Sequence, residues 1–340
     1  MTEANHRPEF QPGEQICSFE VIRHVGSGGY GDIYAVKDVN WNEIYAIKIE
    51  FLDAPQMCLH VESAIMKKLQ GSLHFPRYIA EGMAHTFRYI ALELLGPSLS
   101  TMRRALPQRK YTAYSILRLS YEMVVCIQQF HKTGYAHRDI KPGNFLIRPN
   151  REYPLCLIDF GLANSFINQA TGDHIPFKAN VGFTGTWRYA SLNAHNEVEL
   201  SRRDDLISWF YSILELVDGS VPWPGSHDRN ETEKMKQTMT AEQLCIHLPS
   251  EYISIYKYIM KIKFDEVPDY DFIKNQLIQA LKRHEFNSFR FDWEFLKQKD
   301  LDEISAINLE MGDEPSNVMY GIQIDSKCSL YSCCSCCNVA

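Results

Sequence analysis

The 340-residue chain contains no long apolar run and no excess of positive charge. No stretch approaches the roughly 18 apolar residues of a membrane-spanning helix, and the polar N-terminus, MTEANHRPEFQPGEQ, lacks the apolar segment of a signal peptide. The formal net charge of −7 argues against a general nucleic-acid-binding protein. We therefore expect an intracellular protein of the cytoplasm, with the nucleus as a second location, and no nucleic-acid partner.

Cysteine is sparse along most of the chain and concentrated at its end. Five of the ten cysteines fall within residues 328–340, and the others stand singly among apolar residues. In a reducing compartment, isolated cysteines of this kind are expected to be small core residues with free thiols. These residues are Cys17, Cys58, Cys126, Cys156 and Cys245.

The pattern of apolar residues divides the chain into two regions, and an apolar content of 45% is enough for a sizeable core. Up to about Glu93 the sequence alternates as strands, apart from a helical stretch that begins near Met57. Beyond the break at Gly96-Pro97 helical periodicity dominates, most clearly over 113–131. We therefore expect an α+β fold with a small β-rich N-terminal lobe and a larger α-helical C-terminal lobe.

The ends of the chain differ in composition from its middle. Residues 1–15 are predicted to form an N-terminal extension and residues 16–299 a single two-lobed domain. The stretch DDLISWFYSILELV is apolar nearly all round, which predicts a helix at the centre of the C-terminal lobe. From Asp300 the chain becomes acidic and then rich in cysteine, so residues 300–340 are predicted to form a tail.

The stretch GSGGYG fits the pattern G-x-G-x-x-G with Gly26, Gly28 and Gly31. Alone it is a weak signal, because dinucleotide-binding loops, phosphate-covering loops and ordinary hairpin turns all share it. A dinucleotide-binding loop opens a helix, whereas DIYAVKD after this loop alternates as a strand. The sequence therefore favours a hairpin, which is either a plain turn or a loop whose backbone amides cover nucleotide phosphates.

Two charged residues are predicted to lie on buried faces. Strand alternation in EIYAIKIE places Lys48 on the same face as Ile44 and Ala46. Helical spacing in CLHVESAIMKKL aligns Glu62 with Cys58 on an apolar stripe. A buried charge needs an opposite partner, so we expect Lys48 to pair with Glu62. The alternative is that each side chain extends to water.

The densest group of polar residues lies in YAHRDIKPGNFLI, residues 135–147, with apolar sequence on both sides. It contains Asp139, Lys141 and Asn144, and the short apolar strand YPLCLID ends soon afterwards at Asp159. Charged and amide groups next to core sequence need partners. The pattern therefore indicates a polar site enclosed by the fold.

The glycine loop, YAIK, the helix glutamate, HRDIKPGN and DFG occur in an order and at separations that resemble those of eukaryotic protein kinases. The resemblance implies a two-lobed kinase fold, ATP and Mg²⁺ as cofactors, and protein substrates. A Lys two residues after Asp139 is typical of serine/threonine kinases. A dinucleotide-binding enzyme does not fit, because the glycine loop leads into a strand.

The resemblance also implies a role for each polar residue. Asp139 would accept or orient the proton of the substrate hydroxyl, and Lys141 would contact the γ-phosphate. Asn144 and Asp159 would bind magnesium, with the ion at Asp159 bridging the β- and γ-phosphates. His137 would have a structural role close to Asp159.

The same resemblance places the nucleotide between the lobes. Lys48 would bind the α- and β-phosphates while Glu62 orients it, and Asp205 would hydrogen-bond the backbone of the catalytic loop. The adenine would contact Val25, Ile33, Ala46, Leu92 and Leu146, with backbone hydrogen bonds at Glu93 and Leu95. Without the resemblance these apolar residues would be interpreted as core.

Three stretches narrow the resemblance to the casein kinase 1 family: LELLGPSL at 92–99, FTGTWRYASLNAH at 183–195 and SRRDDLISWFYSILELVDGSVPW at 201–223. Most kinases have Ala-Pro-Glu where this chain has Ala-Ser-Leu-Asn at 190–193. HRDIKPGNF and RYASLNAH are also similar to the tau-tubulin kinase branch. The resemblance covers residues 15–300 and implies a monomeric enzyme that prefers acidic or already phosphorylated (primed) sites.

A preference for primed sites requires a basic pocket beside the activation segment. Arg188 matches one residue of that pocket in the family, but the second basic position falls at or near Val181. Lys178 is the nearest substitute, and Lys234 and Lys236 are the alternatives. The sequence therefore predicts an anion pocket of Arg188 and Lys178.

The chain ends CSLYSCCSCCNVA, in which Cys337 to Ala340 fits the C-a-a-X prenylation pattern, with an Ala compatible with farnesylation. Cys333, Cys334 and Cys336 are candidate palmitoylation sites. Two lipids give stable membrane attachment, whereas one gives marginal binding. A membrane-associated pool is therefore expected if the tail is lipidated. The alternatives are a disordered reduced tail or an adventitious metal site.

A kinase fold can also form a pseudokinase, a scaffold that binds ATP or partners without catalysis. Loss of Lys48, Asp139, Asn144 or Asp159 would favour that interpretation, and all four are present. The sequence therefore predicts an active serine/threonine protein kinase of casein kinase 1 type that acts in signal transduction.

Overall fold

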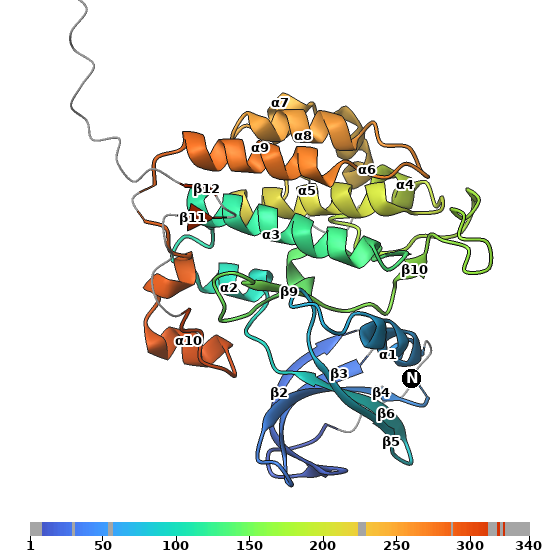
Figure 1. Ribbon diagram of the computed structural model, residues 1–340, viewed down its shortest axis with the longest axis vertical. Helices are drawn as coiled ribbons and strands as arrows, with labels where there is room; N and C mark the ends of the chain where they lie inside the picture. Colours follow the sequence, from blue (N-terminus) through green and yellow to red (C-terminus); the bar gives the residue numbers. More distant parts are fainter. Residues whose placement is uncertain are drawn as a thin grey trace, which may run out of the picture.

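The computed structural model of the chain describes residues 9–28, 31–53, 57–223, 229–286, 288–311, 318–319 and 322–323. Figure 1 shows two lobes, with a curled sheet and helix α1 (Leu59–Lys68) in the lower lobe and most of the helices in the upper. The α+β arrangement expected from the sequence is confirmed. Residues 29–30 of the glycine loop and the candidate lipidation sites Cys333, Cys334, Cys336 and Cys337 lie outside the described residues.

The N-terminal lobe is built on a six-stranded antiparallel sheet of order β1-β2-β3-β4-β6-β5. Its strands are β1 (Gln15–Ile16), β2 (Phe19–Gly28), β3 (Gly31–Asp38), β4 (Ile44–Phe51), β5 (Tyr78–Met83) and β6 (Phe87–Glu93). Because side chains alternate along a strand, one face of β3 and β4 supplies Tyr34, Val36, Ile47 and Ile49 to the core of this lobe. The opposite face carries Ala46 and Lys48.

Part of the predicted N-terminal extension packs on this sheet. The ring of Phe10 lies edge-on to those of Tyr34 and Phe87, at centroid distances of 5.7 and 5.6 Å. Cys17 was expected in the core but is exposed, because it lies in the turn between β1 and β2 with a positive φ of 54°. The other four isolated cysteines are buried, as predicted.

Helix α1 (Leu59–Lys68) connects the sheet to the C-terminal lobe. It packs against β5 and β6, and its residues Ile65 and Met66 belong to the core of the C-terminal lobe. The residue before the helix, Cys58, makes no side-chain capping hydrogen bond. The N-terminus of α1 therefore depends on groups outside the helix for its hydrogen bonds.

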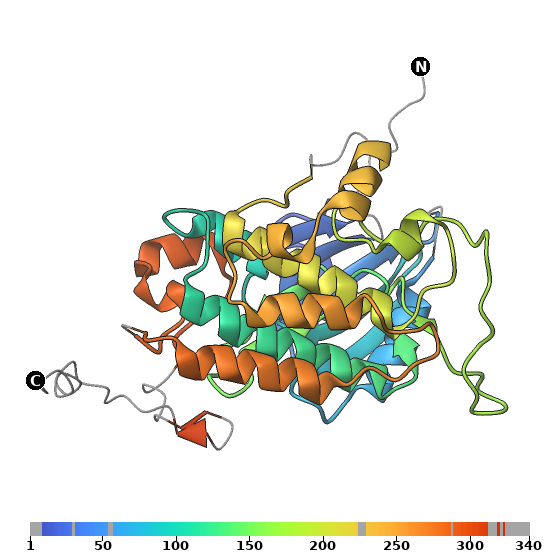
Figure 2. The same ribbon diagram turned by 90° about the horizontal axis from the view of Figure 1, so that it is seen from above.

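The C-terminal lobe is organised around α3 (Ala113–His131) and α5 (Arg202–Asp218). These helices contact each other and are covered by α8 and α9, as Figure 2 shows from above. The predicted central helix is confirmed in α5, where Trp209 and Phe210 are fully buried. At its start the N–H of Ser201 donates to Oδ2 of Asp204 at 2.8 Å, and the helix ends at Gly219, which has the left-handed φ of 80°.

The remaining helices of this lobe are α2 (Leu99–Ala105), α4 (Leu192–His195), α6 (Arg229–Thr238), α7 (Ala241–Leu244), α8 (Glu251–Ile259), α9 (Tyr270–Arg283) and α10 (Gln298–Ile304), with the 3₁₀ helices η1 (Pro142–Asn144) and η2 (Asp292–Phe295). Short antiparallel pairs join β7 (Tyr135–Ala136) to β10 (Asn164–Ser165), β8 (Phe145–Ile147) to β9 (Leu155–Leu157), and β11 (Val318–Met319) to β12 (Ile322–Gln323). The β8–β9 hairpin follows Asn144 and precedes Asp159, so it sets these two residues beside each other.

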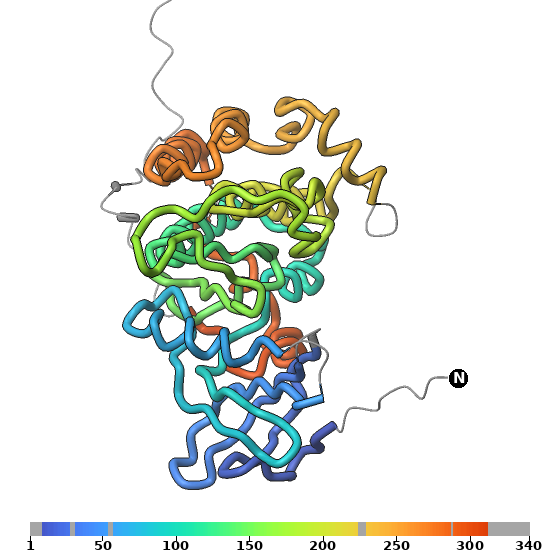
Figure 3. The backbone as a smooth tube through the Cα atoms, turned by 90° about the vertical axis from the view of Figure 1, so that its right-hand side faces the viewer, coloured from blue at the N-terminus to red at the C-terminus, as the bar shows by residue number. Residues whose placement is uncertain are grey.

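The first part of the predicted C-terminal tail is folded onto the C-terminal lobe. The boundary predicted at residue 299 falls inside α10, which contacts α2. Leu301, Leu309 and Met311 belong to the core of the lobe. Cδ2 of Leu309 lies 2.7 Å from the point that a Cβ on Gly96 would occupy, where the chain passes between the lobes. Figure 3 shows this red-orange segment close to the junction of the lobes.

Candidate active site

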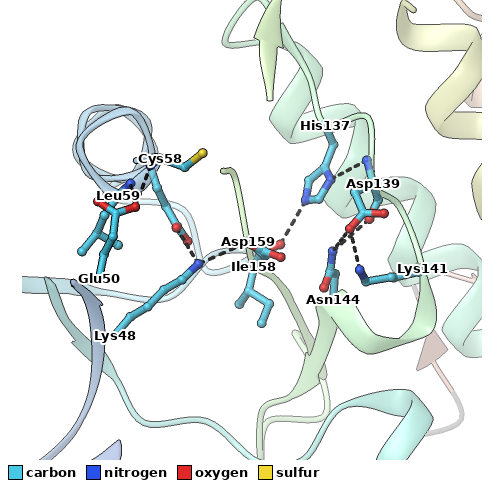
Figure 4. A network of polar contacts seen from close by, with 11 residues as sticks. Lys48, Glu50, Cys58, Leu59, His137, Asp139, Lys141, Asn144, Ile158 and Asp159 are labelled. Atoms are coloured by element: carbon cyan, nitrogen blue, oxygen red, sulfur yellow. Dashed lines mark hydrogen bonds and ion pairs between the residues drawn. The ribbon is translucent and has the colours of Figure 1, made fainter. Parts of the chain in front are cut away.

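Lys48 of β4 forms ion pairs with carboxylates from two other parts of the chain (Figure 4). Its Nζ lies 2.6 Å from Oε2 of Glu62 in α1 and 3.0 Å from Oδ1 of Asp159, which follows β9. The side chains of Lys48 and Glu62 are only 11% and 4% exposed, so neither extends to water. The pair that strand and helix periodicity predicts is therefore present, and Asp159 joins it.

Mutual attraction keeps Lys48 and Asp159 ionised. Burial acts to lower the pKa of Lys48, but the charges and hydrogen bonds of Glu62 and Asp159 outweigh it and raise that pKa above its ordinary value. Burial likewise acts to raise the pKa of Asp159, but Lys48 holds it below the ordinary value. The site therefore presents a fixed positive charge beside a fixed negative charge.

Asp139 lies in the loop between β7 and η1, and both of its carboxylate oxygens have partners. The Thr186 hydroxyl donates to Oδ1 at 2.7 Å, and Nζ of Lys141 lies 2.5 Å from Oδ2. Nδ2 of Asn144 donates to the backbone carbonyl of Asp139 at 2.9 Å. The structure thus brings together the three residues predicted from HRDIKPGN. It adds Thr186, to which the sequence pattern assigns no role in the site.

His137 links this loop to the strand that ends at Asp159, and its contacts define its tautomer. Its Nε2 lies 3.0 Å from the carbonyl oxygen of Ile158, which can only accept, so Nε2 carries the proton. Nδ1 then accepts from the backbone N–H of Asp139 at 3.3 Å. These contacts confirm the structural role expected of His137.

Asp205, in the first turn of α5, fixes the backbone of the same loop. It accepts hydrogen bonds from the N–H groups of His137 and Arg138 at 2.7 and 2.8 Å, and from Nε2 of His131 at 2.7 Å. Burial acts to raise the pKa of Asp205, but His131 and the loop N–H groups lower it below the ordinary value. The contact that the resemblance implies for Asp205 is therefore present.

Two residues of the site have left-handed backbone conformations, which residues other than glycine rarely adopt. They are Arg138, with a φ of 67°, and Asp159, with a φ of 68°. Nε of Arg138 donates to the carbonyl of Leu162 at 2.7 Å, which ties the two strained segments together. After Asp159 the chain turns inward, and the buried ring of Phe160 stacks on Phe130 at a centroid distance of 4.9 Å. Such strain is concentrated at functional sites.

Residues 19–282 match the protein kinase domain family. This chain belongs to that family. A probable serine/threonine-protein kinase of Dictyostelium discoideum is 37% identical over 279 residues, which make up 81% of this chain and 56% of the relative. The chain therefore spans little more than half the length of this curated relative. In the described part of the chain, we find no helix with the length and apolar character needed to cross a membrane.

The face of the kinase sheet that turns away from the N-terminal core carries residues predicted to contact adenine. Ala46 is paired with Leu92 across β4 and β6, and Ile33 is paired with Lys48 across β3 and β4. These apolar residues are half-buried, and Val25 is 47% exposed. A partly open apolar face next to Lys48 is the kind of surface that binds a planar base.

The other predicted adenine contacts lie around the chain that joins the lobes. Leu146 of β8 forms an isolated bridge with Ser98, and Leu95 is buried. The carboxylate of Glu93 is engaged inside the protein, 2.6 Å from a guanidinium nitrogen of Arg148. Roles for these residues in nucleotide binding stay predictions.

The glycine loop of the kinase domain is a hairpin between β2 and β3, as its sequence indicates. Gly26 pairs with Ile33, and Gly28 pairs with Gly31. Gly31 has a φ of 150°, and a Cβ there would lie 2.0 Å from the carbonyl oxygen of Ile49. Close approach of β4 therefore requires glycine at position 31, independently of any nucleotide.

The donor set suits magnesium bound together with a nucleotide. Because Nδ2 of Asn144 faces the Asp139 carbonyl, the amide oxygen of Asn144 is the atom left for a cation, to which Asp159 would add a carboxylate. Within the described ranges no three His, Cys, Asp or Glu side chains gather as a self-sufficient metal site. Magnesium is typically bound by one or two carboxylates plus substrate phosphates, and the residues present fit that pattern.

Among the described residues, no contact joins Arg188 to Lys178, the two residues of the predicted anion pocket. A guanidinium nitrogen of Arg188 lies 3.8 Å from Oε2 of Glu215 in α5, and the Arg188 side chain is 36% exposed. Lys178 is exposed, and its backbone carbonyl accepts from the N–H of Glu199. The anion pocket stays a prediction, with Glu215 as an internal competitor for Arg188.

Lys236, an alternative for the second cation of that pocket, is buried and turned inward. It is 2% exposed, and its Nζ donates to the carbonyls of Trp187 and Ala190 at 2.7 and 2.8 Å. Nε2 of His195 is its third partner, at 3.2 Å. Lys236 therefore supports the backbone of the segment that carries Arg188, whereas the remaining alternative, Lys234, is exposed.

Proposed function

We propose that this chain is an ATP-dependent serine/threonine protein kinase. The proposal rests mainly on the contact of Lys48 with both Glu62 and Asp159. In protein kinases the Lys–Glu ion pair and the magnesium-binding Asp must both be in place for catalysis. The similarity to a probable serine/threonine-protein kinase supports the class of acceptor residue.

The geometry supports in-line phosphoryl transfer. The oxygen of a Ser or Thr hydroxyl placed beside Asp139 forms a bond to the γ-phosphorus while the bond to the β–γ bridging oxygen breaks, and ADP leaves. Asp139 takes the hydroxyl proton, and Lys141, whose Nζ is 2.5 Å from Oδ2 of Asp139, would contact the γ-phosphate and stabilise the charge that develops there. Lys48 stabilises the α- and β-phosphates, and magnesium held by Asn144 and Asp159 would neutralise charge on the β- and γ-phosphates.

The proposed activity is tested by transfer of labelled phosphate from Mg-ATP to casein, with Asp139→Ala as the control. We expect label on Ser or Thr that disappears in the variant. A folded wild-type protein that binds ATP without transferring phosphate would contradict the proposal. That result would favour the alternative of a pseudokinase scaffold.

Within the kinases we propose a casein kinase 1 type, related to the tau-tubulin branch. The segment Ala-Ser-Leu-Asn that replaces Ala-Pro-Glu is joined to α5 by hydrogen bonds to a buried carboxylate, since Ser191 and Asn193 donate to Oδ1 of Asp204 at 2.7 and 2.8 Å. Ser191 also accepts from the Ala194 N–H at the start of α4. These hydrogen bonds give a structural role to the Ala-Ser-Leu-Asn segment, through which the chain resembles that family.

We propose that substrates carry acidic or phosphorylated residues near the acceptor. Arg188 is the residue that supports the proposal, because part of its side chain reaches solvent two residues after Thr186. Its distance of 3.8 Å from Glu215 leaves it only partly neutralised. Paired primed and unprimed peptides of one sequence measure this preference directly.

We further propose a monomeric intracellular enzyme with a membrane-associated pool that depends on lipids at the C-terminal cysteines. The support is the C-a-a-X pattern at Cys337 with Cys333, Cys334 and Cys336 upstream. The intact mass of protein purified from its native cells tests the proposal. An unmodified C-terminus would contradict it.

A further inference from the structure

Glu50 is a fully buried carboxylate to which the sequence pattern gives no role. It lies on β4 two residues after Lys48, on the same face of the strand. Its Oε1 accepts hydrogen bonds from the N–H groups of Cys58 and Leu59 at 2.6 and 2.9 Å. Figure 4 shows Glu50 reaching the first turn of α1 beside the contacts of Lys48.

These bonds give α1 the N-terminal cap that its own sequence lacks. The first N–H groups of a helix have no partner within the helix, and Cys58 supplies no side-chain cap. A carboxylate is a favourable partner at this position because it also interacts with the positive end of the helix dipole. Nε of Arg88 in β6 lies 3.6 Å from Oε2 of Glu50, so the buried charge also has a cation nearby.

The two contacts between β4 and α1 have matching spacing. Lys48 and Glu50 are two residues apart, which is about 6.6 Å along a strand. Their partners, Glu62 and Cys58, are four residues apart, which is about 6 Å along a helix. Between β4 and α1, one ion pair alone would leave rotation of the helix about it unrestrained, whereas two contacts at similar spacing restrain both its register and its direction, in addition to the packing of α1 on β5 and β6.

We propose that Glu50 is a positioning residue for phosphoryl transfer, which caps α1 and so places Glu62 where it orients Lys48. The inference rests on the proposed kinase function. Lys48 and Glu50 belong to the same strand and therefore move together. A residue of the sheet thus fixes the position of α1 relative to Lys48.

The test compares Glu50→Ala, Glu50→Gln and Asp38→Ala. Asp38 is a matched control: it is also buried in the N-terminal lobe and accepts from two backbone N–H groups, those of Asn40 and Trp41 at 2.8 and 3.2 Å, but in a turn remote from α1. Gln at position 50 keeps an oxygen that can accept from Cys58 and Leu59, so it separates hydrogen bonding from charge.

The first measurement is hydrogen exchange of the α1 amides, which needs no activity. Loss of a helix cap shifts a local equilibrium by roughly 2- to 30-fold, so we expect faster exchange in α1 for Glu50→Ala and a smaller change for Glu50→Gln. Asp38→Ala is expected to leave exchange in α1 unchanged. Unchanged exchange in Glu50→Ala would overturn the proposal.

The second measurement is kcat/KM for phosphate transfer in wild-type and Glu62→Ala backgrounds. Glu50→Ala is expected to lower kcat/KM about tenfold in the wild type and less than twofold when Glu62 is already absent. An equal loss in both backgrounds, or an equal loss in Asp38→Ala, would show a general effect on the fold and overturn the proposal. A wild-type protein without activity would contradict the kinase function, while the exchange measurement would still decide the role of Glu50.

Discussion

The hydroxyl of Thr186 donates a 2.7 Å hydrogen bond to Oδ1 of Asp139, although 47 residues separate them in the sequence. The same hydroxyl accepts from Nζ of Lys141 at 3.2 Å. The bond ties the segment that carries Arg188 to the residue proposed to take the substrate proton. The residue proposed to recognise the substrate and the residue proposed to take its proton are therefore joined through Thr186.

Replacing Thr186 with Val should lower kcat for peptide phosphorylation by about tenfold, because a lost hydrogen bond to a charged group is worth about 1.5–3 kcal/mol. The KM for ATP should change little, since Thr186 contacts Asp139 and Lys141 and not Lys48 or Asp159. Thr186→Ser keeps the hydroxyl and should retain most of the activity. Steady-state kinetics with both substrates varied would measure these effects, and equal losses in the two variants would contradict the role of the hydroxyl.

Replacing Asp205 with Asn should lower both kcat and stability, because the amide cannot accept from His137, Arg138 and His131 together. A loss of about 2–3 kcal/mol in the free energy of unfolding is expected. Asp204→Asn is the matched control: Asp204 is equally buried but bonds Ser191 and Asn193 away from the catalytic loop. Denaturant unfolding and kcat measured side by side should show similar instability but a large loss of kcat only for Asp205→Asn.

The stability conferred by Lys236 should depend on pH. Burial lowers the pKa of Lys236 to about 7, whereas an unfolded lysine titrates near 10.4. The groups that titrate and face Lys236 are His195 of α4, at 3.2 Å, and Tyr211 of α5, whose ring lies 5.1 Å from Nζ, and the charge of Arg229 in α6 acts on His195. Between these two pKa values the unfolded state binds a proton that the native state lacks, so the free energy of unfolding rises with pH. Below pH 7 both states are protonated, and the cost of the buried charge is fully present.

Relative to Lys236→Met, the wild type should therefore gain up to about 1.4 kcal/mol of stability per pH unit from pH 7 towards pH 10. Denaturant unfolding at half-unit intervals of pH would measure the difference. Lys257→Met serves as the control, because Lys257 is exposed and pairs with Glu242. Parallel curves for the wild type and Lys236→Met would show that Lys236 does not titrate in this range.

Arg188→Ala should reduce turnover of a primed peptide roughly tenfold or more, since charge-assisted pairs of Arg with phosphate are strong, with little effect on the unprimed peptide. Lys178→Ala tests whether that exposed side chain supplies the second cation. The ratio of kcat/KM for paired peptides is the measurement. Equal losses on both peptides would remove Arg188 from substrate recognition.

The sequence predicts the elements of the active site well where the signal is local. Alternation in β4 and helical spacing in α1 each place one charge on a buried face, and the two charges meet as Lys48 and Glu62. The HRDIKPGN and DFG motifs likewise combine residue types and spacing that few other sites need. Short-range periodicity is enough to predict these residues because their neighbours in sequence determine which way their side chains point.

The remaining features depend on contacts that no local pattern contains. The sequence pattern gives Glu50 no role and offers Lys236 as an alternative for the anion pocket, yet both are buried and bind backbone N–H or carbonyl groups of other elements. Backbone groups occur at every residue, so sequence alone gives no sign of which will be unpaired. Cys17 illustrates the reverse case, an apolar-looking residue exposed because a turn places it there.

Residues 288–311 fold onto the C-terminal lobe, and this determines where a fragment of the protein should end when it is expressed. The family match ends at residue 282, but the buried Phe291 and Trp293, as well as Leu309, lie beyond it. The carboxylate of Asp292 also accepts from the N–H of Thr112, just before α3. A fragment that ends at residue 282 would leave one end of α3 without its partner and would expose apolar surface. It should therefore aggregate, whereas a fragment that ends after residue 311 should stay in solution.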